Sequence, residues 1–391
     1  MKSVNDLAQI NKCSGCTACL NVCPTSSLSM RINEKGFLYP EVDTNKCIRC
    51  NACSNNCPWL SQSNESPISK QELYSVKRSN FKKRMKSQSG GAFSAYAEYV
   101  LKNKGVVYGV AFKNNEAIYC RVTSIRGLKK LKGSKYVQAS VGGVFKNVFD
   151  DLSKNRTVLF SGTACHVDGL KSFLSAKKAD TSKLITIDII CHGVVSPMIF
   201  KDYISYTEKS IGKRIKKFNF RDKSFGWHGH FVSFKAGSNY YKSKNYVKIF
   251  YSSYALRDTC FECRYANLNR MSDVTIGDSW GIGDYYPDFD DNKGCSLIIQ
   301  NTDKGKELFN RTKDQFISLK INKNEALQPN LEHPTEKPCD YDNFWQDYHK
   351  FGFEYAVFKY CEFNSTPDKI VLKKHQVIKR IVAKIKRIFG F

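Results

Sequence analysis

The chain has 391 residues, sixteen of them cysteine, and carries a net charge of +26. This length predicts two or three domains around a large core. The start lacks the apolar stretch of a secretory signal, and no apolar run reaches the about 18 residues of a membrane helix, so we expect neither export nor a membrane span. Many cysteines without an export signal indicate the reducing cytoplasm, where thiolates bind metals rather than form disulfides.

Near its start the chain carries the same cysteine phrase twice. Each copy reads C-x2-C-x2-C-x3-C-P, the run with which bacterial two-cluster ferredoxins hold 4Fe-4S cubanes. Three close cysteines of one copy bind one cubane, and the fourth binds the other cubane. Zinc sites would need longer loops between cysteine pairs, often with histidine, and a disulfide scaffold would need a secretory signal. The spacing therefore predicts one cubane on Cys13, Cys16, Cys19 and Cys57, and a second on Cys47, Cys50, Cys53 and Cys23.

The rest of the chain divides by composition and periodicity. We expect a ferredoxin domain over residues 1–62 and a linker over residues 63–86, where the sequence begins polar and turns basic. Strand-like and helix-like stretches then alternate, which predicts a mixed α/β body. The expected strands cover residues 106–112, 118–123, 157–161, 184–190, 231–234, 274–276 and 296–300, and the expected helices cover 92–102, 167–174 and 198–209.

Two glycine-containing turns of the body are candidate ligand sites. Ser89, Gly90 and Gly91 precede an expected helix, where backbone amides and hydroxyls are able to hold a phosphate; an ordinary turn is the alternative. Gly162 and Thr163 follow one expected strand and precede a helix, which is where open α/β sheets bind ligands.

Four cysteines of the body stand at element ends or in a C-x2-C pair: Cys165, Cys191, Cys260 and Cys263. If they gather at one rim of the sheet, they are able to hold a third 4Fe-4S cluster. The alternative for each is a small buried hydrophobic residue. We assign that alternative to the remaining cysteines, which are Cys120, Cys295, Cys339 and Cys361.

The C-terminal residues 368–391 combine apolar residues at helical spacing with many lysines and arginines. This pattern predicts a basic amphipathic helix that lies at the inner face of an anionic membrane, or else packs on its own domain. The strong positive charge of the chain also calls for an anionic partner. Because no nucleic-acid-binding motif is present, we expect an anionic coenzyme or a nucleotide-linked substrate and no nucleic acid.

Several phrases of the body resemble the beta-subunit family of coenzyme F420 hydrogenases and dehydrogenases. They are GSKYVQAS, LFSGTACHVDGLKSFL, DIICHGVVSP, NFRDKSFGWHG and CFECRYANLNRMSDVTIGDSWGI. That family is similar to the 7-hydroxymethyl chlorophyll a reductases and includes bacterial members associated with polysaccharide biosynthesis. The resemblance implies an N-terminal family domain over residues 87–165, a C-terminal family domain over residues 166–340 and an extension over residues 341–391.

The resemblance also implies an iron–sulfur flavoprotein that carries FAD and exchanges electrons with a partner protein. The four body cysteines match cysteines of the family, which supports a third cluster. The residues that match family positions in a flavin or substrate pocket, or next to it, are Ser89, Gly90, Gly91, Lys135, Tyr136, Gln138, Gly162, Thr163, Asp273, Gly277, Asp278, Trp280 and Gly281. The chain departs from the family pattern at Ala139, Ala164 and His166, where the family usually has serine, proline and glutamine.

Together these features predict an oxidoreductase in which electrons enter at the N-terminal cubanes, pass to the body cluster and reach a hydride-transferring flavin. His166 and His192 stand next to proposed cluster ligands and are candidate proton donors; a structural role is the alternative for both. The alternative function is a non-catalytic subunit that relays electrons to a separate enzyme. A membrane-docked scaffold for glycan assembly is a third hypothesis, which depends on the basic C-terminal segment alone.

Overall fold

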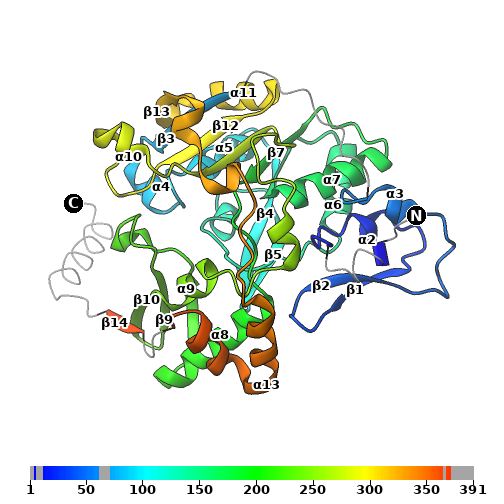
Figure 1. Ribbon diagram of the computed structural model, residues 1–391. Coiled ribbons are helices and arrows are strands. Elements are labelled where there is room, and N and C mark those ends of the chain that lie inside the picture. Colours follow the sequence, from blue (N-terminus) through cyan, green and yellow to red (C-terminus); the bar gives the residue numbers. More distant parts are fainter. Residues whose placement is uncertain (1–3, 6–11, 61–70, 364–366, 371–391) are drawn as a thin grey trace.

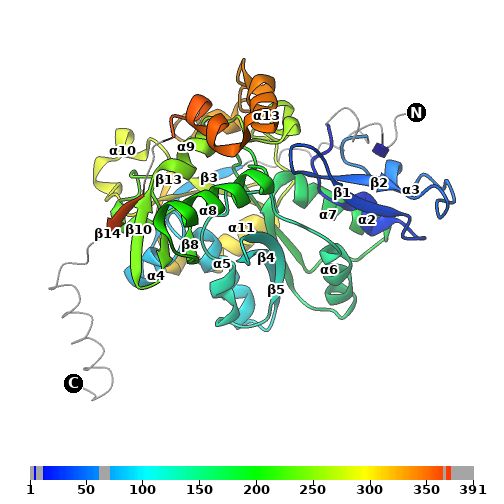
Figure 2. The ribbon, with the colours of Figure 1, turned by 90° about the horizontal axis from the view of Figure 1, so that it is seen from below.

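Figure 1 shows the computed structural model of the chain, which describes residues 4–5, 12–60, 71–363 and 367–370. A small N-terminal domain lies at one side of a large mixed α/β body, and the view in Figure 2 shows the same arrangement. The predicted fold class, an α/β body with an N-terminal ferredoxin domain, is confirmed.

The small domain contains helix α2 (Ala18–Val22), the hairpin of β1 (Leu28–Ile32) and β2 (Leu38–Val42), and helix α3 (Ala52–Asn55). The two copies of the cysteine phrase adopt the same local shape. In each copy, a residue with left-handed backbone precedes the helix: φ is 61° at Thr17 and 57° at Asn51. The chain therefore turns sharply after two cysteines of each phrase and continues as a short helix.

An eight-stranded mixed sheet forms the centre of the body, with the strand order β13-β3-β12-β11-β7-β6-β4-β5. Four adjacent strands, β11, β7, β6 and β4, are parallel, and the other strands pair antiparallel. The strands are β3 (Glu72–Arg78), β4 (Val106–Lys113), β5 (Glu116–Val122), β6 (Val158–Thr163), β7 (Leu184–Ile189), β11 (Val274–Asp278), β12 (Ser296–Gln300) and β13 (Phe316–Ile321).

Helices cover both faces of this sheet. Helices α5 (Ala92–Lys102) and α11 (Asp303–Asn310) pack on one face, and α6 (Val144–Ser153) and α7 (Ala164–Ala176) pack on the other. Successive side chains of β4 point to opposite faces of the sheet and so pack in both cores. Tyr108 packs with α6 and α7, whereas Val107 packs with α5. The strands of both expected family domains share this one sheet, and the boundary expected at residue 165 falls inside α7.

A second sheet of four strands has the order β14-β10-β9-β8 and lies near helices α8, α9 and α13 (Figure 2). Its strands are β8 (Ile215–Asn219), β9 (Val232–Ala236), β10 (Asn239–Ser243) and β14 (Asp368–Ile370). The remaining helices are α4 (Phe81–Met85), α8 (Pro197–Ile211), α9 (Asn245–Tyr251), α10 (Ile282–Tyr285), α12 (Lys323–Ala326) and α13 (Tyr341–Tyr360), which bends at Gly352. Short 3-10 turns are η1 (Gly127–Lys130), η2 (Lys223–Phe225), η3 (Asp258–Glu262), η4 (Pro287–Phe289), η5 (Lys313–Gln315) and η6 (Pro329–Leu331).

All seven expected strands are present, as β4, β5, β6, β7, β9, β11 and β12, and the three expected helices are α5, α7 and α8. The linker expected over residues 63–86 is wrong from Glu72 onward, because this stretch forms β3 and α4. Strand β3 lies between β12 and β13, with Val76 fully buried. Its basic residue Arg78 is also buried, where it forms an ion pair with Glu98 at 3.0 Å. The charge of Arg78, one of the basic residues that suggested a solvated linker, is thus neutralised inside the core by Glu98.

The C-terminal segment also differs from the helix expected over residues 368–391. Asp368–Ile370 form β14, which pairs antiparallel with β10, because the open edge of β10 offers backbone partners to an extended segment. Residues 371–391 lie outside the described residues. Among the residues that the structure describes, no helix is both long enough and apolar enough to cross a membrane.

The part of the expected extension that precedes β14 belongs to the body. Helix α13 buries Tyr341, Phe344 and Trp345 in the same core as α7 and α8. Residues 341–360 are therefore an integral layer of the body rather than a peripheral tail.

Candidate functional site

A cavity of about 270 Å³ lies at the carboxyl ends of the parallel strands β4, β6, β7 and β11, and we call it the sheet-edge cavity. This is the position at which open α/β sheets bind ligands, because the strands end there and the loops diverge. The structure brings together in its wall most of the residues singled out from the sequence: Ser89, Gly91, Lys135, Tyr136, Gly162, Thr163, Cys191, His192, His166, Gly277 and Asp278.

The Ser-Gly-Gly turn forms one wall of this cavity. Ser89 donates a hydrogen bond to the carbonyl of Cys295 at 2.6 Å, and the amide of Gly90 donates to the Ser296 hydroxyl at 2.9 Å. Gly90 itself faces away from the cavity, and a side chain there would place its Cβ 2.1 Å from the carbonyl oxygen of Val76. These two donors fix the turn on Cys295 and β12, and the carbonyl of Gly90 accepts a hydrogen bond from the amide of Arg78 on β3. The turn therefore offers a ligand a wall of backbone at close range.

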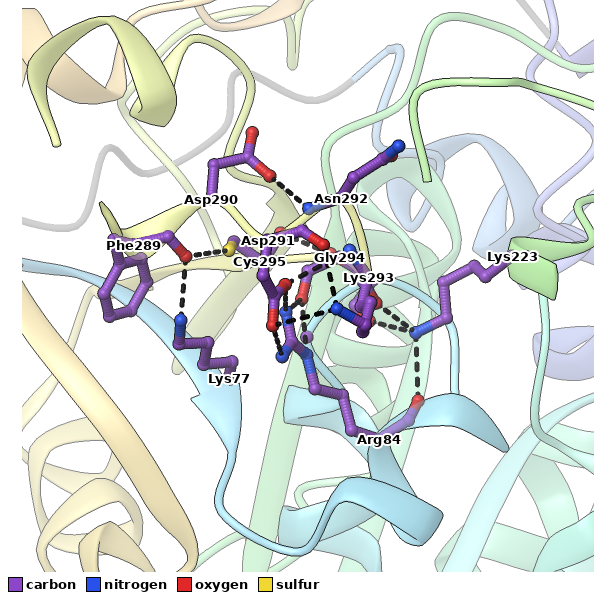
Figure 3. Close-up of polar contacts among 12 residues, drawn as sticks. Lys77, Arg84, Lys223, Phe289, Asp290, Asp291, Asn292, Lys293, Gly294 and Cys295 are labelled. Atoms are coloured by element: carbon purple, nitrogen blue, oxygen red, sulfur yellow. Dashed lines mark hydrogen bonds and ion pairs between the residues drawn. The ribbon is translucent and has the colours of Figure 1, made fainter. Parts of the chain in front are cut away.

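A polar network contacts this turn at the carbonyl of Ser89, and Figure 3 shows its residues Lys223, Arg84, Asp291, Lys293 and Gly294. The ammonium of Lys223 donates to the carbonyls of Arg84 at 2.9 Å, Ser89 at 2.6 Å and Lys293 at 3.0 Å. The guanidinium of Arg84 donates to the carboxylate of Asp291 and to the carbonyl of Gly294. Three loops far apart in the sequence are thereby tied together at one edge of the cavity, and this keeps its wall rigid.

The predicted Lys-Tyr-Val-Gln phrase is divided between two places. The ammonium of Lys135 donates to the carbonyls of Leu131 and Lys132, and burial lowers the pKa of Lys135 to about 7. Tyr136 stacks on Phe250 with ring centroids 4.5 Å apart and lines the cavity. Gln138 does not line it. Its amide lies between the ferredoxin domain and the body, 3.4 Å from the carbonyl of Ser14.

Gly162 is required for a close contact beside the cavity. A Cβ at this position would lie 2.0 Å from the hydroxyl of Tyr119, which is 3.0 Å from Nδ1 of His166. Burial, together with the nearby charge of Arg257, lowers the pKa of His166 to about 4. His166 is therefore neutral at neutral pH and paired with a buried tyrosine, an arrangement that fits the structural alternative as well as a proton-donating role.

His192 also lines the cavity with both ring nitrogens engaged. Its Nε2 lies 3.2 Å from the hydroxyl of Ser253, and its Nδ1 lies 3.1 Å from that of Thr335. Two hydroxyl partners fix the ring orientation, and burial lowers the pKa of His192.

An arginine that the sequence did not single out lies beside Asp278. Arg221 is 4% exposed and pairs with Asp278, whose other carboxylate oxygen accepts a hydrogen bond from Trp227 at 2.9 Å. The rings of Trp227 and Trp280 stack 4.8 Å apart. The signal in the sequence was the phrase NFRDKSFGWHG, in which Arg221 and Trp227 both stand.

The four body cysteines are free thiols close to one another. Burial raises the pKa of Cys165 to about 11 and that of Cys191 to about 12, and the nearby thiolate of Cys263 adds to both shifts. Burial also raises the pKa of Cys260 and that of Cys263; for Cys260, the three other body cysteines add to the shift. Four thiolates in so small a buried space repel one another, so cations are needed if they are to ionise together.

The eight ferredoxin cysteines are also free, and the two sets differ in their surroundings. Cys16 and Cys19 are buried, whereas Cys50 is exposed. Burial raises the pKa of Cys57 to about 11, with the thiolate of Cys13 adding to the shift. The first predicted ligand set therefore faces the body, and the second set lies nearer the surface.

One segment of the body, residues 257–264, contacts the first ligand set directly. The carbonyl of Cys13 accepts hydrogen bonds from Arg257 at 2.6 Å and from Thr259 at 2.9 Å. The carbonyl of Pro58 accepts one from Arg264, which follows Cys263. The segment that carries two of the body cysteines is thus anchored to the backbone of the first ligand set.

Helix α7 makes the second contact between the ferredoxin domain and the body. A Cβ at Gly169 would lie 2.9 Å from the Cβ of Cys16 and 3.0 Å from its sulfur. Cys165 is near enough to Cys16 for its thiolate to raise the pKa of Cys16, after the larger effect of burial. The first ligand set and the body cysteines therefore adjoin each other.

Among the described residues, no three histidine, cysteine or acidic side chains converge on a point that would hold a single metal ion. The four thiolates of a cubane bind four different irons, so they surround a cluster rather than meet at one point. Free and adjacent thiols, most of them half-buried, are the donor set that such clusters use.

The remaining cysteines divide by burial. Cys295 and Cys361 are buried, as expected for small hydrophobic residues, and Cys120 is half-buried. Cys339 is exposed, so the prediction for it is wrong; it lies in the loop before α13 rather than in a core.

Two sequence families match parts of the chain. Residues 12–60 match the sequence family described as a 4Fe-4S dicluster domain, and residues 155–324 match that described as the C terminus of the coenzyme F420 hydrogenase/dehydrogenase beta subunit. Among solved structures, the chain is similar to a chain of the F420-reducing NiFe hydrogenase complex from Methanosarcina barkeri. The two share 15% identity over 75% of this chain and 94% of that chain, with a TM-score of 0.46. A comparison with curated proteins finds no match.

The family resemblance stated from the sequence is therefore confirmed for residues 155–324, and the two-cluster domain for residues 12–60. The chain joins a two-cluster iron–sulfur electron-transfer domain to a region of the hydrogenase and dehydrogenase beta-subunit type.

Proposed function

From the match of residues 155–324 to a hydrogenase and dehydrogenase beta subunit, we propose that the chain is an iron–sulfur, flavin-dependent oxidoreductase of the cytoplasm. The observation that carries this proposal is the contact of Cys16 with Gly169 on α7, the helix that also bears Cys165. It makes the buried ligand set of the ferredoxin domain adjacent to the body cysteines. Cys191 of the latter lines the sheet-edge cavity. The second ligand set with the exposed Cys50, the first ligand set and the body cysteines thus form a series that ends at the cavity wall.

Cys165, Cys191, Cys260 and Cys263 fit a third 4Fe-4S cluster. They come from the ends of β6 and β7 and from one short segment, they form no disulfide, and they affect one another's pKa. Arg270 would support such a site, because it is buried, lowers the pKa of Cys191 and pairs with Asp188 at 3.2 Å. A cluster there would adjoin both the first ligand set and the cavity.

The sheet-edge cavity fits a flavin. Aromatic side chains of Phe93, Tyr136 and Phe250 supply apolar walls, and the ends of β6 and β11 supply backbone. Tyr246 donates to the carbonyl of Tyr136 at 2.6 Å, which fixes the stacked pair of Tyr136 and Phe250. FAD, when bound, converts single electrons from iron–sulfur clusters into hydride transfer. The chain's own residues shape the walls and exclude water.

The resemblance to bacterial proteins associated with polysaccharide biosynthesis makes a sugar-linked anionic compound a substrate class to test. The electron partner would be a small carrier protein that docks near Cys50, the exposed ligand of the second set. A peripheral membrane contact through residues 371–391 stays a prediction outside the described residues; deletion of that segment with recovery of the protein from vesicles tests it.

Anaerobic purification followed by iron, acid-labile sulfide and flavin counts tests the proposed function. We expect about twelve irons and one FAD per chain, and reduction of the flavin after dithionite reduces the clusters. About eight irons without flavin would contradict the proposal and favour the relay subunit, since only the ferredoxin domain would then carry cofactors. Turnover of an artificial acceptor by the isolated chain separates the two functions further.

A further inference from the structure

A second and larger hollow, of about 800 Å³, adjoins the sheet-edge cavity. The two share Ser87, Gln88 and the segment from Lys132 to Lys135 as a common wall. Its other walls come from β8, β9, the turn after β4 and 3-10 turn η1. We call it the basic cleft after the ten cationic residues that line it: Lys86, Lys129, Lys130, Lys132, Lys135, Lys216, Lys217, Arg221, Lys223 and Lys235.

Most of these basic side chains have no carboxylate partner. Burial lowers the pKa of Lys135 and that of Lys223 to about 7, so the positive charge of the cleft comes chiefly from the other eight. Among the described residues, only Lys132 and Arg221 of this set form ion pairs, with Glu98 and Asp278. The one carboxylate in the cleft wall, that of Asp222, accepts hydrogen bonds from Ser224 and Ser233. Like charges that crowd a concave surface create a positive potential, which concentrates anions.

Two buried donors of the cleft also lack hydrogen-bond partners in the described part of the chain. They are Nε of Arg221 and Nε2 of Gln88. Arg221 is nearly inaccessible, and Gln88 stands in the wall shared with the sheet-edge cavity. Buried donors are normally paired, so an acceptor from a ligand would relieve both.

The cleft also offers aromatic surface for a ring. Tyr240 is 39% exposed, and the ammonium of Lys235 lies 5.6 Å from the centre of its ring. Phe112 and Phe218 are partly buried in the same wall. A sugar or base is able to stack on such surfaces while the lysines bind its phosphates.

We propose that the basic cleft binds the diphosphate of a second ligand, separate from the flavin, as found in a nucleoside diphosphate or a diphosphate-linked sugar. Two adjacent phosphates present many anionic oxygens over a short length, which suits a crowded set of ammonium groups better than a single carboxylate does. The common wall would let the reacting end of the ligand reach the sheet-edge cavity. Only this last point rests on the proposed function, because binding of the diphosphate requires no turnover.

Calorimetric titration of the anaerobically purified holoprotein tests the proposal, with inorganic pyrophosphate, UDP and triglutamate as ligands. We expect pyrophosphate and UDP to bind, UDP more tightly because its base stacks, and both to weaken as salt rises. Triglutamate should bind more weakly. Tighter binding of UDP than of pyrophosphate assigns the cleft to nucleotide-linked ligands, and equal binding assigns it to the diphosphate alone.

A triple substitution in the cleft, Lys129→Gln, Lys130→Gln and Lys217→Gln, changes exposed residues and leaves the core intact. We expect it to weaken UDP binding by at least about tenfold, because several charge-assisted hydrogen bonds are lost. The control triple Lys102→Gln, Lys104→Gln and Lys154→Gln removes the same charge from exposed positions outside the cleft and should change binding less than about twofold.

Three results would overturn the proposal: no binding of pyrophosphate or UDP, equal weakening by the two triple variants, or triglutamate binding as tightly as UDP. Loss of FAD from the cleft variant would also overturn it, since the cleft would then hold the flavin's own diphosphate. Failure of the proposed function shows itself differently, as eight irons and no flavin in the unaltered protein. The two failures are therefore distinguishable.

Discussion

The two copies of the cysteine phrase have the same spacing and the same local backbone but opposite surroundings. In the first copy, Cys16 and Cys19 are buried, and the adjoining helix α2 contacts α6 and α7 of the body. In the second copy, Cys50 is exposed, and α3 has no buried residue. The difference arises from what packs against each copy, because the ligand pattern itself is identical.

The two cluster sites therefore differ in their access to solvent, although their ligand phrases are the same. A cluster bound by the first set would be screened from water by the body, and one bound by the second set would be accessible to a partner protein. Burial, nearby charge and hydrogen bonds set the reduction potentials of such clusters. We therefore expect two electronically different cubanes from one repeated phrase, and the following predictions test that difference in order of decreasing effect.

Removal of one ligand from each set should have unequal consequences. Cys16→Ser and Cys50→Ser should each lower the iron content by about four per chain. Only Cys16→Ser should also loosen the ferredoxin domain from the body, because metal binding and folding are coupled and Cys16 contacts α7. Iron analysis combined with limited proteolysis checks this. Equal proteolytic sensitivity of the two variants would show that the buried set does not anchor the domain.

The sequence specified the chemistry of these sites better than their placement. Cysteine spacing is fixed by the cluster, so the ligand sets could be assigned without a structure. Apolar strands such as 184–190 were also recognisable, since Leu184, Thr186, Ile187 and Asp188 are buried and lie on both faces of the strand. Strand β3 was missed because Arg78 is neutralised by Glu98, a residue twenty positions away.

The placement of Gln138 and Arg257 was also unpredictable, because their partners lie far away in the sequence. Gln138 was assigned to a ligand pocket, yet its amide oxygen accepts a hydrogen bond from Arg257 at 3.0 Å, beneath the ferredoxin domain. This pair joins residues 119 positions apart. Contacts between distant segments depend on how domains meet, and a single sequence carries no direct signal of that.

Arg257 should tune the potential of the buried cubane. It is 1% exposed, and among the described residues its guanidinium donates hydrogen bonds only to neutral oxygens, those of Cys13, Gln138 and Leu38. A buried cation without a carboxylate partner is costly unless an anion lies near, and the thiolates around a cubane supply that negative charge.

Arg257→Gln should therefore lower the reduction potential of the buried cubane by about 60 mV or more and leave the exposed cubane unchanged. Arg257→Lys should restore part of the shift, because it retains the charge. Potentiometric titration followed by electron paramagnetic resonance separates the signals of the two ferredoxin cubanes; the cluster proposed at Cys165 also lies near Arg257 and should shift with the buried cubane. A shift of both cubanes, or of neither, would refute the assignment of Arg257 to the first ligand set.

Gly169→Ala should disturb the buried set alone. The added methyl group would meet Cys16 at 2.9 Å, so we expect a net loss of about 1–2 kcal/mol in the free energy of unfolding, despite the better helix propensity of alanine. Gly143→Ala is the control, because nothing lies within 4 Å of its added Cβ and its φ is −90°. Thermal unfolding of both variants measures the effect. Equal stability of the two variants would contradict the prediction, because it would mean that α7 shifts away from Cys16 without loss of stability.

The smallest effect concerns the exposed set. Lys46 and Arg49 are exposed next to Cys50, so they would attract an acidic electron carrier. The ion pair of Lys46 with Asp43 at 3.3 Å is exposed and contributes little to stability. Reversal of both charges, Lys46→Glu with Arg49→Glu, should slow reduction by an acidic ferredoxin several-fold at low salt. Reduction by dithionite should change little, and Lys102→Glu with Lys104→Glu should leave both rates near those of the unaltered protein.

Because screening by salt removes attraction between exposed charges, the reduction rates of the variant and the unaltered protein should converge at high ionic strength. Rates that stay apart at high salt would instead mean that the substitutions damaged the second cluster, and electrons would then enter elsewhere.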